Sequence, residues 1–295
     1  MKRSPAQPSG ARPAEATARP RARRLTRSAT LTTGCTVAGL IGLLALVSLF
    51  WLPYPSDDTS GGRLTAPAAD HLLGTDRLGR DLFTQLMTGS RIAVQAGLGS
   101  VLIAATVGVT LGVLAAFAQG WLDDTLSVLL DILIAFPTLL LAMLIVAARS
   151  ATLESAVLAI GLAQSAVVGR LVRVLVKRVL AQEYITASRT SGTSWPRIVA
   201  GHILPNIWPT LVVNLALQFG LAVLAEAGLS YLGLGAPPPN ASWGRMLHEA
   251  QATFTTAPAG ALAPGILLVA LVIGVNLIAD GLRDTLDPAA RRRRA

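Results

Sequence analysis

Long apolar runs alternate with short polar segments along the whole chain. The first run carries no charge, and at about 1.5 Å per helical residue it is long enough to cross the roughly 30 Å hydrocarbon core of a bilayer. The pattern predicts six transmembrane helices, at residues 31–52, 92–121, 126–148, 153–169, 207–225 and 262–278. The predicted fold class is therefore all-α, a polytopic membrane protein with six transmembrane helices.

The polar and small residues between and within these runs refine the pattern. Asp123 and Asp124 predict a tight turn before the third run, and Pro137 interrupts that run. Small residues within the runs allow helix backbones to approach closely in lipid. The candidates for such crossings are Gly112, Gly161, Ala163, Gly220 and Gly274.

The first run could also belong to a signal peptide, because a basic stretch precedes it and residues 66–68 mimic an Ala-x-Ala cleavage site. The run is longer than the 7–15 apolar residues of a signal sequence, so a retained membrane anchor is predicted. The single cysteine, Cys35, lies in this run and is predicted to be a small buried side chain.

The charged residues follow a topological pattern. Charged residues make up 14% of the chain, against about 25% in a soluble domain. Of the 25 Lys and Arg residues, eight lie in 1–30, six in 170–197 and five in 283–294. Six spans place all three basic blocks on one side, which the positive-inside rule makes cytoplasmic. The net charge of +9 therefore reflects topology, and no nucleic-acid partner is expected.

A polar, basic segment between the fourth and fifth runs predicts a helix-turn-helix. Residues 172–190 lack Gly and Pro and can form one helix, and Gly192 permits a turn with positive φ. Thr193 or Ser194 can cap a second short helix, with Pro196 in its first turn. Pro205 is predicted to stop that helix.

The same segment resembles the EAA loop of ABC-importer permeases. The matching residues are Thr186, Ala187, Ser188, Gly192, Ile203, Leu204 and Pro205. Thr186 stands where the family usually has glutamate, and Ser188 stands where it has alanine. In that family the loop carries a coupling helix that seats in a groove of the ATPase subunit.

Further motifs narrow the resemblance to the C-type subunit of the dipeptide/oligopeptide/nickel importer family. They are His71–Asp81 (HLLGTDRLGRD), Leu229–Gly235 (LSYLGLG) with Ser242-Trp243-Gly244, and Asp280–Asp284 (DGLRD) with Leu286-Asp287-Pro288. The resemblance covers roughly residues 30–290. It implies four regions: a disordered basic cytoplasmic tail at 1–28, a first transmembrane helix and extracytoplasmic segment at 29–91, a permease core with five transmembrane helices at 92–288, and a basic tail at 289–295.

The resemblance also implies the partners and the location. These are a second permease subunit, two cytoplasmic ABC ATPase subunits, an extracytoplasmic solute-binding protein and membrane lipid, in a bacterial plasma membrane with both termini cytoplasmic. No cofactor is expected, because ATP would be bound by the partner subunits. The implied cargo is a di- or oligopeptide. Nickel uptake by the same architecture and a stand-alone secondary transporter remain alternatives.

The remaining candidate chemistry is sparse. The chain has no Gly-Lys dipeptide, which a Walker A phosphate loop requires, and His71, His202 and His248 do not have metal-ligand spacing. No catalytic or metal site is therefore predicted, and His202 is expected to pack or hydrogen-bond.

Three acids near or within the runs need a partner or solvent. Asp131, Glu226 and Asp280 are predicted to be solvated or paired with arginine at helix ends. The stretch 233–239 cannot be helical, and Trp243 after it is predicted to anchor at the membrane interface. This outer segment could meet a binding protein or only cap the bundle.

Overall fold

The computed structural model describes residues 20–118, 120–238 and 240–286, and for 20–28 it describes the backbone alone. This part of the chain is helical and forms no strand, which confirms the all-α fold class. Its elements are α1 Pro20–Val47, α2 Leu82–Phe117, α3 Trp121–Ala135, α4 Thr138–Ala148, α5 Leu153–Leu180, α6 Glu183–Thr190, α7 Trp195–Ile198, the π-helical η1 Val199–Ile203, α8 Leu204–Tyr231, α9 Trp243–Ala250, the 3₁₀ turn η2 Gln251–Thr253 and α10 Ala259–Leu286.

Five helical runs are long and apolar enough to cross a membrane. They are Ala29–Val47, Leu82–Phe117, Leu153–Leu180, Trp195–Tyr231 and Ala259–Leu286. The predicted third span is not one straight helix, because α3 and α4 meet at a 90° bend. Phe136 is extended with ψ 131°, as expected before a proline, and Pro137 cannot donate a helical hydrogen bond. The described spans number five, or six if this bent pair counts as one.

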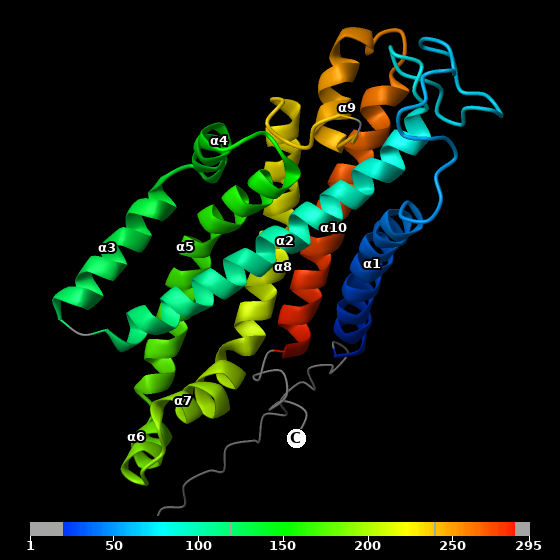
Figure 1. Ribbon diagram of the computed structural model, residues 1–295. Coiled ribbons are helices and arrows are strands. Elements are labelled where there is room, and N and C mark those ends of the chain that lie inside the picture. The colour runs from blue at the N-terminus through cyan, green and yellow to red at the C-terminus, as the bar shows by residue number, and fades with distance from the viewer. Residues whose placement is uncertain (1–19, 119, 239, 287–295) are drawn as a thin grey trace, which may run out of the picture.

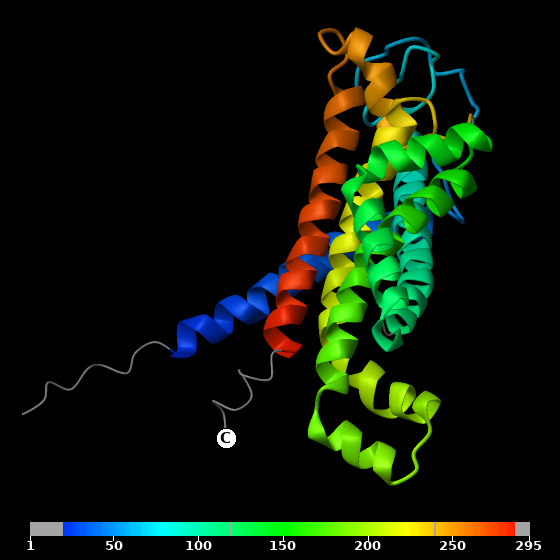
Figure 2. The ribbon, with the colours of Figure 1, turned by 90° about the vertical axis from the view of Figure 1, so that its left-hand side faces the viewer.

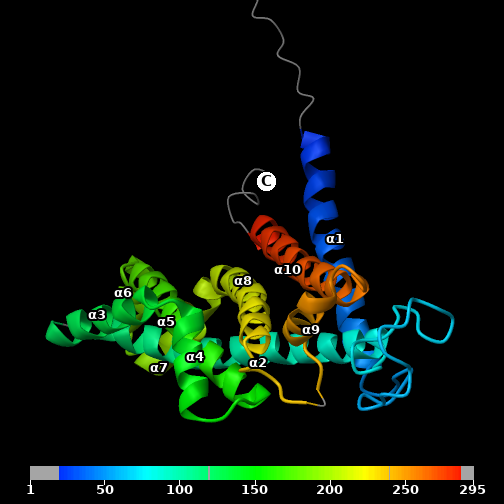
Figure 3. The ribbon, with the colours of Figure 1, turned by 90° about the horizontal axis from the view of Figure 1, so that it is seen from above.

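The helices form one bundle with two distinct ends. In Figure 1, α2 crosses α5. Helices α8 and α10 stand beside each other, and α1 packs against α10. Seen from above, α3 and α1 lie at opposite edges (Figure 3). Figures 1 and 2 place α6 and α7 at the same end as the start of α1 and the finish of α10. The other end carries residues 51–81, α9 and η2, which together are called the cap.

Small residues do allow close helix crossings. A Cβ atom on Gly112 would lie 2.5 Å from the carbonyl oxygen of Gly169 in α5, and one on Gly161 would lie 2.9 Å from that of Ser100 in α2. Gly220 differs, because its nearest neighbours would be 3.7 Å away. At these glycines the backbone of one helix lies against both the backbone and the branched side chains of the other, such as Val172 and Ile103, which is why α2 and α5 approach closely.

Several predicted boundaries are shifted. α2 begins at Leu82 and not at 92, because Asp81 caps it: the carboxylate accepts the N–H of Thr84 at 2.7 Å. The turn predicted at Asp123 and Asp124 is wrong, since both lie in the first turn of α3 and the turn falls at Gly120, with φ 58°.

The ends of the chain extend the helices as well. α1 begins at Pro20, inside the predicted tail 1–28, and Cys35 is exposed on it, contrary to the predicted burial. Residues 1–19 and the tail 289–295 lie outside the described residues.

Candidate functional site

The segment between α5 and α8 folds as a helix-turn-helix, called here the docking loop (residues 181–203). The single helix predicted over 172–190 is wrong, because the chain breaks at Ala181 and Gln182, where Gln182 is extended with ψ 140°. α5 runs straight through the basic region to Leu180, and the short helix α6 follows at an angle (Figure 2). The loop therefore projects beyond the bundle.

The turn after α6 has the hydrogen bonds of a Schellman motif. Gly192 has φ +86°, as predicted, and its N–H bonds the carbonyl of Arg189 at 3.0 Å. The N–H of Thr193 bonds the carbonyl of Ser188 at 3.2 Å. No atom lies within 4 Å of a Cβ built on Gly192. Glycine is needed here for its backbone angle and not for space.

α7 is seated by its tryptophan. Ser194 occupies the capping position without a side-chain hydrogen bond, and Pro196 lies in the first turn as predicted. The guanidinium of Arg189 lies 4.8 Å from the centre of the Trp195 ring, and Phe117 meets that ring edge-on at 5.0 Å. Trp195 thus joins α6, α7 and the end of α2.

Pro205 does not stop the second helix, contrary to the prediction. α7 passes through the π turn η1 into α8, and the N–H of Leu204 bonds the carbonyl of Val199. The π turn adds one residue, so Pro205 falls in the first turn of α8, where a missing N–H is tolerated. The loop and α8 therefore form one helical run, Trp195–Tyr231.

The predicted loop residues divide into an exposed and a buried set. Thr186, Ala187, Gly192 and Pro205 are exposed, Ser188 and Leu204 are half-buried, and Ile203 is buried. The exposed residues lie mainly on α6 and its turn. The end of the motif, around Ile203, lies on the inner side, so the two halves of the motif are on different faces of the loop.

Sequence reasoning missed two of the three side chains that hold the loop in place, Ile185 and Ile198, and named the third, Ile203, only as a motif residue. Ile185, Ile198 and Ile203 are 2%, 0% and 0% exposed and share one apolar cluster with residues of α2, α5 and α8. Their signal was available, because they are aliphatic residues in an otherwise polar stretch. The site has no arrangement of titratable groups for bond chemistry. It presents an exposed surface on α6 and its turn, which the buried isoleucines hold against the bundle.

Acids of α3 neutralise part of the basic region. Asp123 accepts from Arg173 at 2.6 Å and also from Lys177, and Asp131 lies 3.2 Å from Arg170. The prediction of an arginine-paired Asp131 is confirmed. Three of the six basic residues at 170–197 are therefore paired, and α3 is fixed to α5 beside the docking loop.

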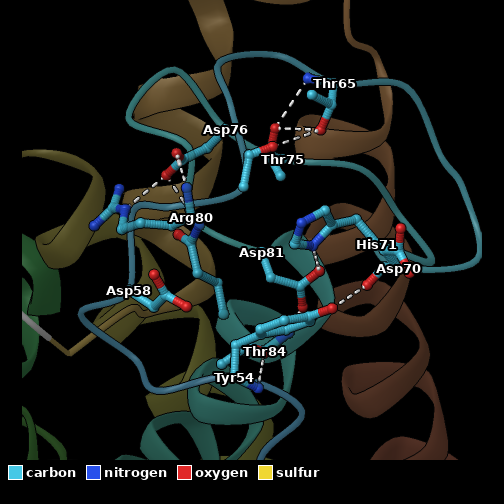
Figure 4. A network of polar contacts seen from close by, with 12 residues as sticks. Tyr54, Asp58, Thr65, Asp70, His71, Thr75, Asp76, Arg80, Asp81 and Thr84 are labelled. Atoms are coloured by element: carbon cyan, nitrogen blue, oxygen red, sulfur yellow. Dashed lines mark hydrogen bonds and ion pairs between the residues drawn. The ribbon is translucent and has the colours of Figure 1, made fainter.

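The cap is built from the HLLGTDRLGRD motif (Figure 4). The Asp76 carboxylate accepts the N–H groups of Leu78 and Arg80 at 2.8 and 2.9 Å and the Arg80 side chain at 2.7 Å. Asp81 caps α2 with one oxygen, and its other oxygen lies 3.0 Å from Nδ1 of His71. The motif therefore folds the cap onto the start of α2.

Two further predictions need correction here. Trp243 is 1% exposed and donates its Nε1–H to the carbonyl of Leu86 at 3.1 Å, so it is buried in the protein and not anchored at the membrane interface. Glu226 is also 1% exposed and bonds Ser230 Oγ at 2.5 Å; it is neither solvated nor paired with arginine within the described chain.

Other predictions agree with the structure. Asp280 is exposed, and residues 233–238 are not helical. The rings of His202 and Tyr184 meet edge-on with centroids 6.1 Å apart, as expected of a packing residue.

Comparisons with known proteins converge on one family. The family model described as "Binding-protein-dependent transport system inner membrane component" matches residues 108–292. The dipeptide transport system permease protein DppC of Alkalihalophilus pseudofirmus is 40% identical over 79% of this chain and 77% of its own length. The glutathione transport system permease protein GsiD of Pectobacterium atrosepticum is 39% identical over 85% of each chain. The nickel transport system permease protein NikC of Escherichia coli is 36% identical over 85% of this chain and 91% of its own.

A solved structure has the same fold. A chain of the inward-facing MetNI methionine ABC transporter superposes with a TM-score of 0.59 at 19% identity. The match covers 69% of this chain and 96% of that chain. At this identity the likeness concerns the fold, and the relatives above carry the family assignment.

Proposed function

The chain belongs to the family of binding-protein-dependent transport system inner membrane components, and from this premise we propose its orientation, its assembly and its cargo. It is a multi-pass permease subunit of an ABC importer. Its docking loop is the part that we assign to the ATPase, and the cap is the part that we assign to the extracytoplasmic side.

Orientation is proposed first. The docking loop, the start of α1 and the finish of α10 lie at one end of the bundle (Figure 1). Along the chain, one of the three basic blocks of the sequence runs into the start of α1, another continues from the finish of α10, and the third leads into the docking loop. Since basic residues stay in the cytoplasm, this end and both termini are cytoplasmic. The bent pair of α3 and α4 then counts as one crossing, and the cap is extracytoplasmic.

The observation that carries the docking assignment is the division of the loop into two faces. Ile185 and Ile198 hold the inner face in the apolar cluster, while Thr186 and Ala187 remain exposed on the outer face. A loop whose inner face is packed against the bundle and whose outer face is exposed can transmit force from a partner that binds the outer face. We assign this partner as a cytoplasmic ABC ATPase, which binds the ATP that powers transport.

The proposed assembly has two docking loops, one on each of two permease subunits. We propose that this chain pairs with a second permease subunit, that each permease engages one ATPase, and that an extracytoplasmic binding protein delivers the solute. ATP binding favours the state in which the ATPases are closed, and the loops move with them. The permease pair then shifts towards the outward-facing state, because the partners bind the two states with different affinity.

The cargo is assigned from the relatives. Two of them are named for dipeptide and glutathione transport, which are peptide cargoes, and a third is named for nickel. We therefore propose a di- or oligopeptide as the solute, with nickel as the second candidate. The cytoplasmic ATPase hydrolyses ATP. This chain provides half of the transport pathway and one docking loop that moves with an ATPase.

The decisive experiment reconstitutes the complete complex in liposomes, with the binding protein outside and ATP enclosed. ATP-dependent uptake that requires the binding protein is the expected result. Competition with unlabelled dipeptides and with Ni²⁺ then separates the two cargoes. Gradient-driven uptake by the isolated chain without ATP would overturn the proposal in favour of a secondary transporter.

A further inference from the structure

Two consecutive residues at the start of α9 contact two different spanning helices. Trp243 donates a hydrogen bond to the carbonyl of Leu86 in α2 at 3.1 Å. At Gly244 the α9 backbone lies against α8, since a Cβ there would be 1.9 Å from the carbonyl oxygen of Ala227. Any side chain larger than hydrogen at Gly244 would therefore separate α9 from α8.

The preceding residue contributes a polar contact. Ser242 is 0% exposed, and its hydroxyl oxygen caps α9 by accepting the N–H of Arg245 at 3.2 Å. The Ser242 hydroxyl also lies near the carboxyl group of Glu226 in α8. Glu226 is itself bonded by Ser230 of its own helix. A buried acid within a span is costly unless it is bonded, so these hydroxyls explain why Glu226 is tolerated there.

The opposite side of α9 is tied to the rest of the cap. Glu249 accepts from Arg80 Nη2 at 2.6 Å and from Arg245 Nε at 2.9 Å. Arg80 is bonded in turn to Asp76. Residues 51–81 are thereby linked through α9 to α8, and α9 is the bridge between the two.

α8 leads from this bridge to the docking loop. The helical run Trp195–Tyr231 includes α7 at one end and Glu226 near the other. α8 itself, with 28 residues at about 1.5 Å each, extends roughly 42 Å, and α7 lies at an angle to its lower end (Figures 1 and 2). A tilt of α8 at its cap end would therefore displace its other end, where the docking loop joins it.

We propose that Ser242, Trp243 and Gly244, with Glu226, form a clamp that joins the cap to α8 and carries the signal of a solute-loaded binding protein from the cap to the docking loop. This inference rests on the proposed function. The clamp residues are positioning residues, because they act through α8 and touch neither solute nor nucleotide.

The test compares basal and binding-protein-stimulated ATP hydrolysis in the complete complex. Gly244→Ala forces α9 away from Ala227, and stimulation is expected to fall about fivefold or more while basal hydrolysis is retained. Gly265→Ala is the matched control, because its Cβ would meet Leu247 of α9 at an ordinary 3.9 Å. That variant should be stimulated like the wild type.

A second pair of variants tests the polar contacts of the clamp. Ser242→Ala removes the hydroxyl that caps α9 and lies near Glu226, whereas Ser230→Ala removes the hydroxyl that bonds Glu226 from within α8. Only the first should uncouple stimulation, and Ser242→Thr, which keeps a hydroxyl, should restore it. This pair decides the matter if Gly244→Ala prevents co-purification with the ATPases.

The outcomes separate the two proposals. A wild-type complex that is not stimulated by its binding protein contradicts the proposed function. A stimulated wild type together with full stimulation of Gly244→Ala, or with equal losses in Ser242→Ala and Ser230→Ala, overturns the clamp alone.

Discussion

The two ends of the bundle are held together by different forces. At the docking loop, Ile185, Ile198 and Ile203 are buried in an apolar cluster, and exposed hydrogen bonds such as that from Arg189 to the carbonyl of Thr193 join residues close in sequence. In the cap, charged groups such as Arg80 and Glu249 form ion pairs that bridge distant segments. Apolar anchoring has no strong direction, whereas each hydrogen bond fixes an angle. Substitutions on the outer face of the loop should therefore leave its anchoring intact, whereas substitutions in the hydrogen-bond network of the cap should disturb its structure.

The glycines show the same contrast. Gly192 in the loop has open space around it and is required for its positive φ alone. Gly244 in the cap is required because another backbone lies against it. The loop thus needs glycine for a backbone angle, whereas the cap needs glycine for space between two helices.

The largest expected effect comes from removing an apolar anchor of the loop. Ile198→Ala deletes a fully buried side chain and should cost about 2–5 kcal/mol of local stability. We expect protease cleavage within 181–203 and loss of co-purifying ATPase. Val174→Ala, at a position 40% exposed on α5, is the control. Equal behaviour of the two variants would show that the loop is not held by its buried isoleucines.

A smaller effect is expected from the turn of the loop. Gly192→Val places a β-branched residue at φ +86° and should cost about 1–3 kcal/mol. Uptake and ATPase binding should fall while membrane insertion is retained. Gly192→Asn is the control, because asparagine tolerates the left-handed region better than other residues. Normal transport by the valine variant would remove the turn from the comparison.

The cap is tested at the capping residue of α2. Asp81→Ala removes the acceptor for the Thr84 N–H and should cost about 0.5–2 kcal/mol. The expected result is a lower Tm of the complex and faster cleavage within residues 51–81. Asp81→Asn keeps a good capping side chain and should be milder. If the asparagine variant were as damaged as the alanine variant, the contact of Asp81 with His71 would matter more than its capping of the α2 N-terminus.

The sequence could predict what local rules decide. The positive φ of Gly192, the position of Pro196 and the apolar spans each follow from neighbouring residues, and they agree with the structure. The predicted helix over 172–190 and the predicted stop at Pro205 were wrong. The chain breaks at Ala181 and Gln182, and the π turn η1 places Pro205 in the first turn of α8, where its missing N–H is tolerated.

Long-range contacts were beyond such rules. Arg80 and Glu249 are 169 residues apart, and no local pattern connects them. Trp243 was assigned to the membrane interface from its residue type, but its ring is enclosed by the cap and α2. Pro137 was recognised as an interruption, yet the 90° bend depends on how α4 packs against α5 and α8. Tertiary packing decides these features.

The smallest effect is expected at the ion pair between α3 and α5. The side chains of Asp131 and Arg170 are 56% and 57% exposed, and an exposed pair contributes about 0–1 kcal/mol. Asp131→Asn should therefore leave both Tm and uptake close to the wild type. Asp123→Asn should perturb more, since Asp123 holds both Arg173 and Lys177. A variant at Asp131 that assembles normally but does not transport would give this acid a role in conduction, as intramembrane acids often have. That result would place a functional polar group away from both ends of the bundle, and the division between an anchored loop and a hydrogen-bonded cap would no longer describe where the molecule does its work.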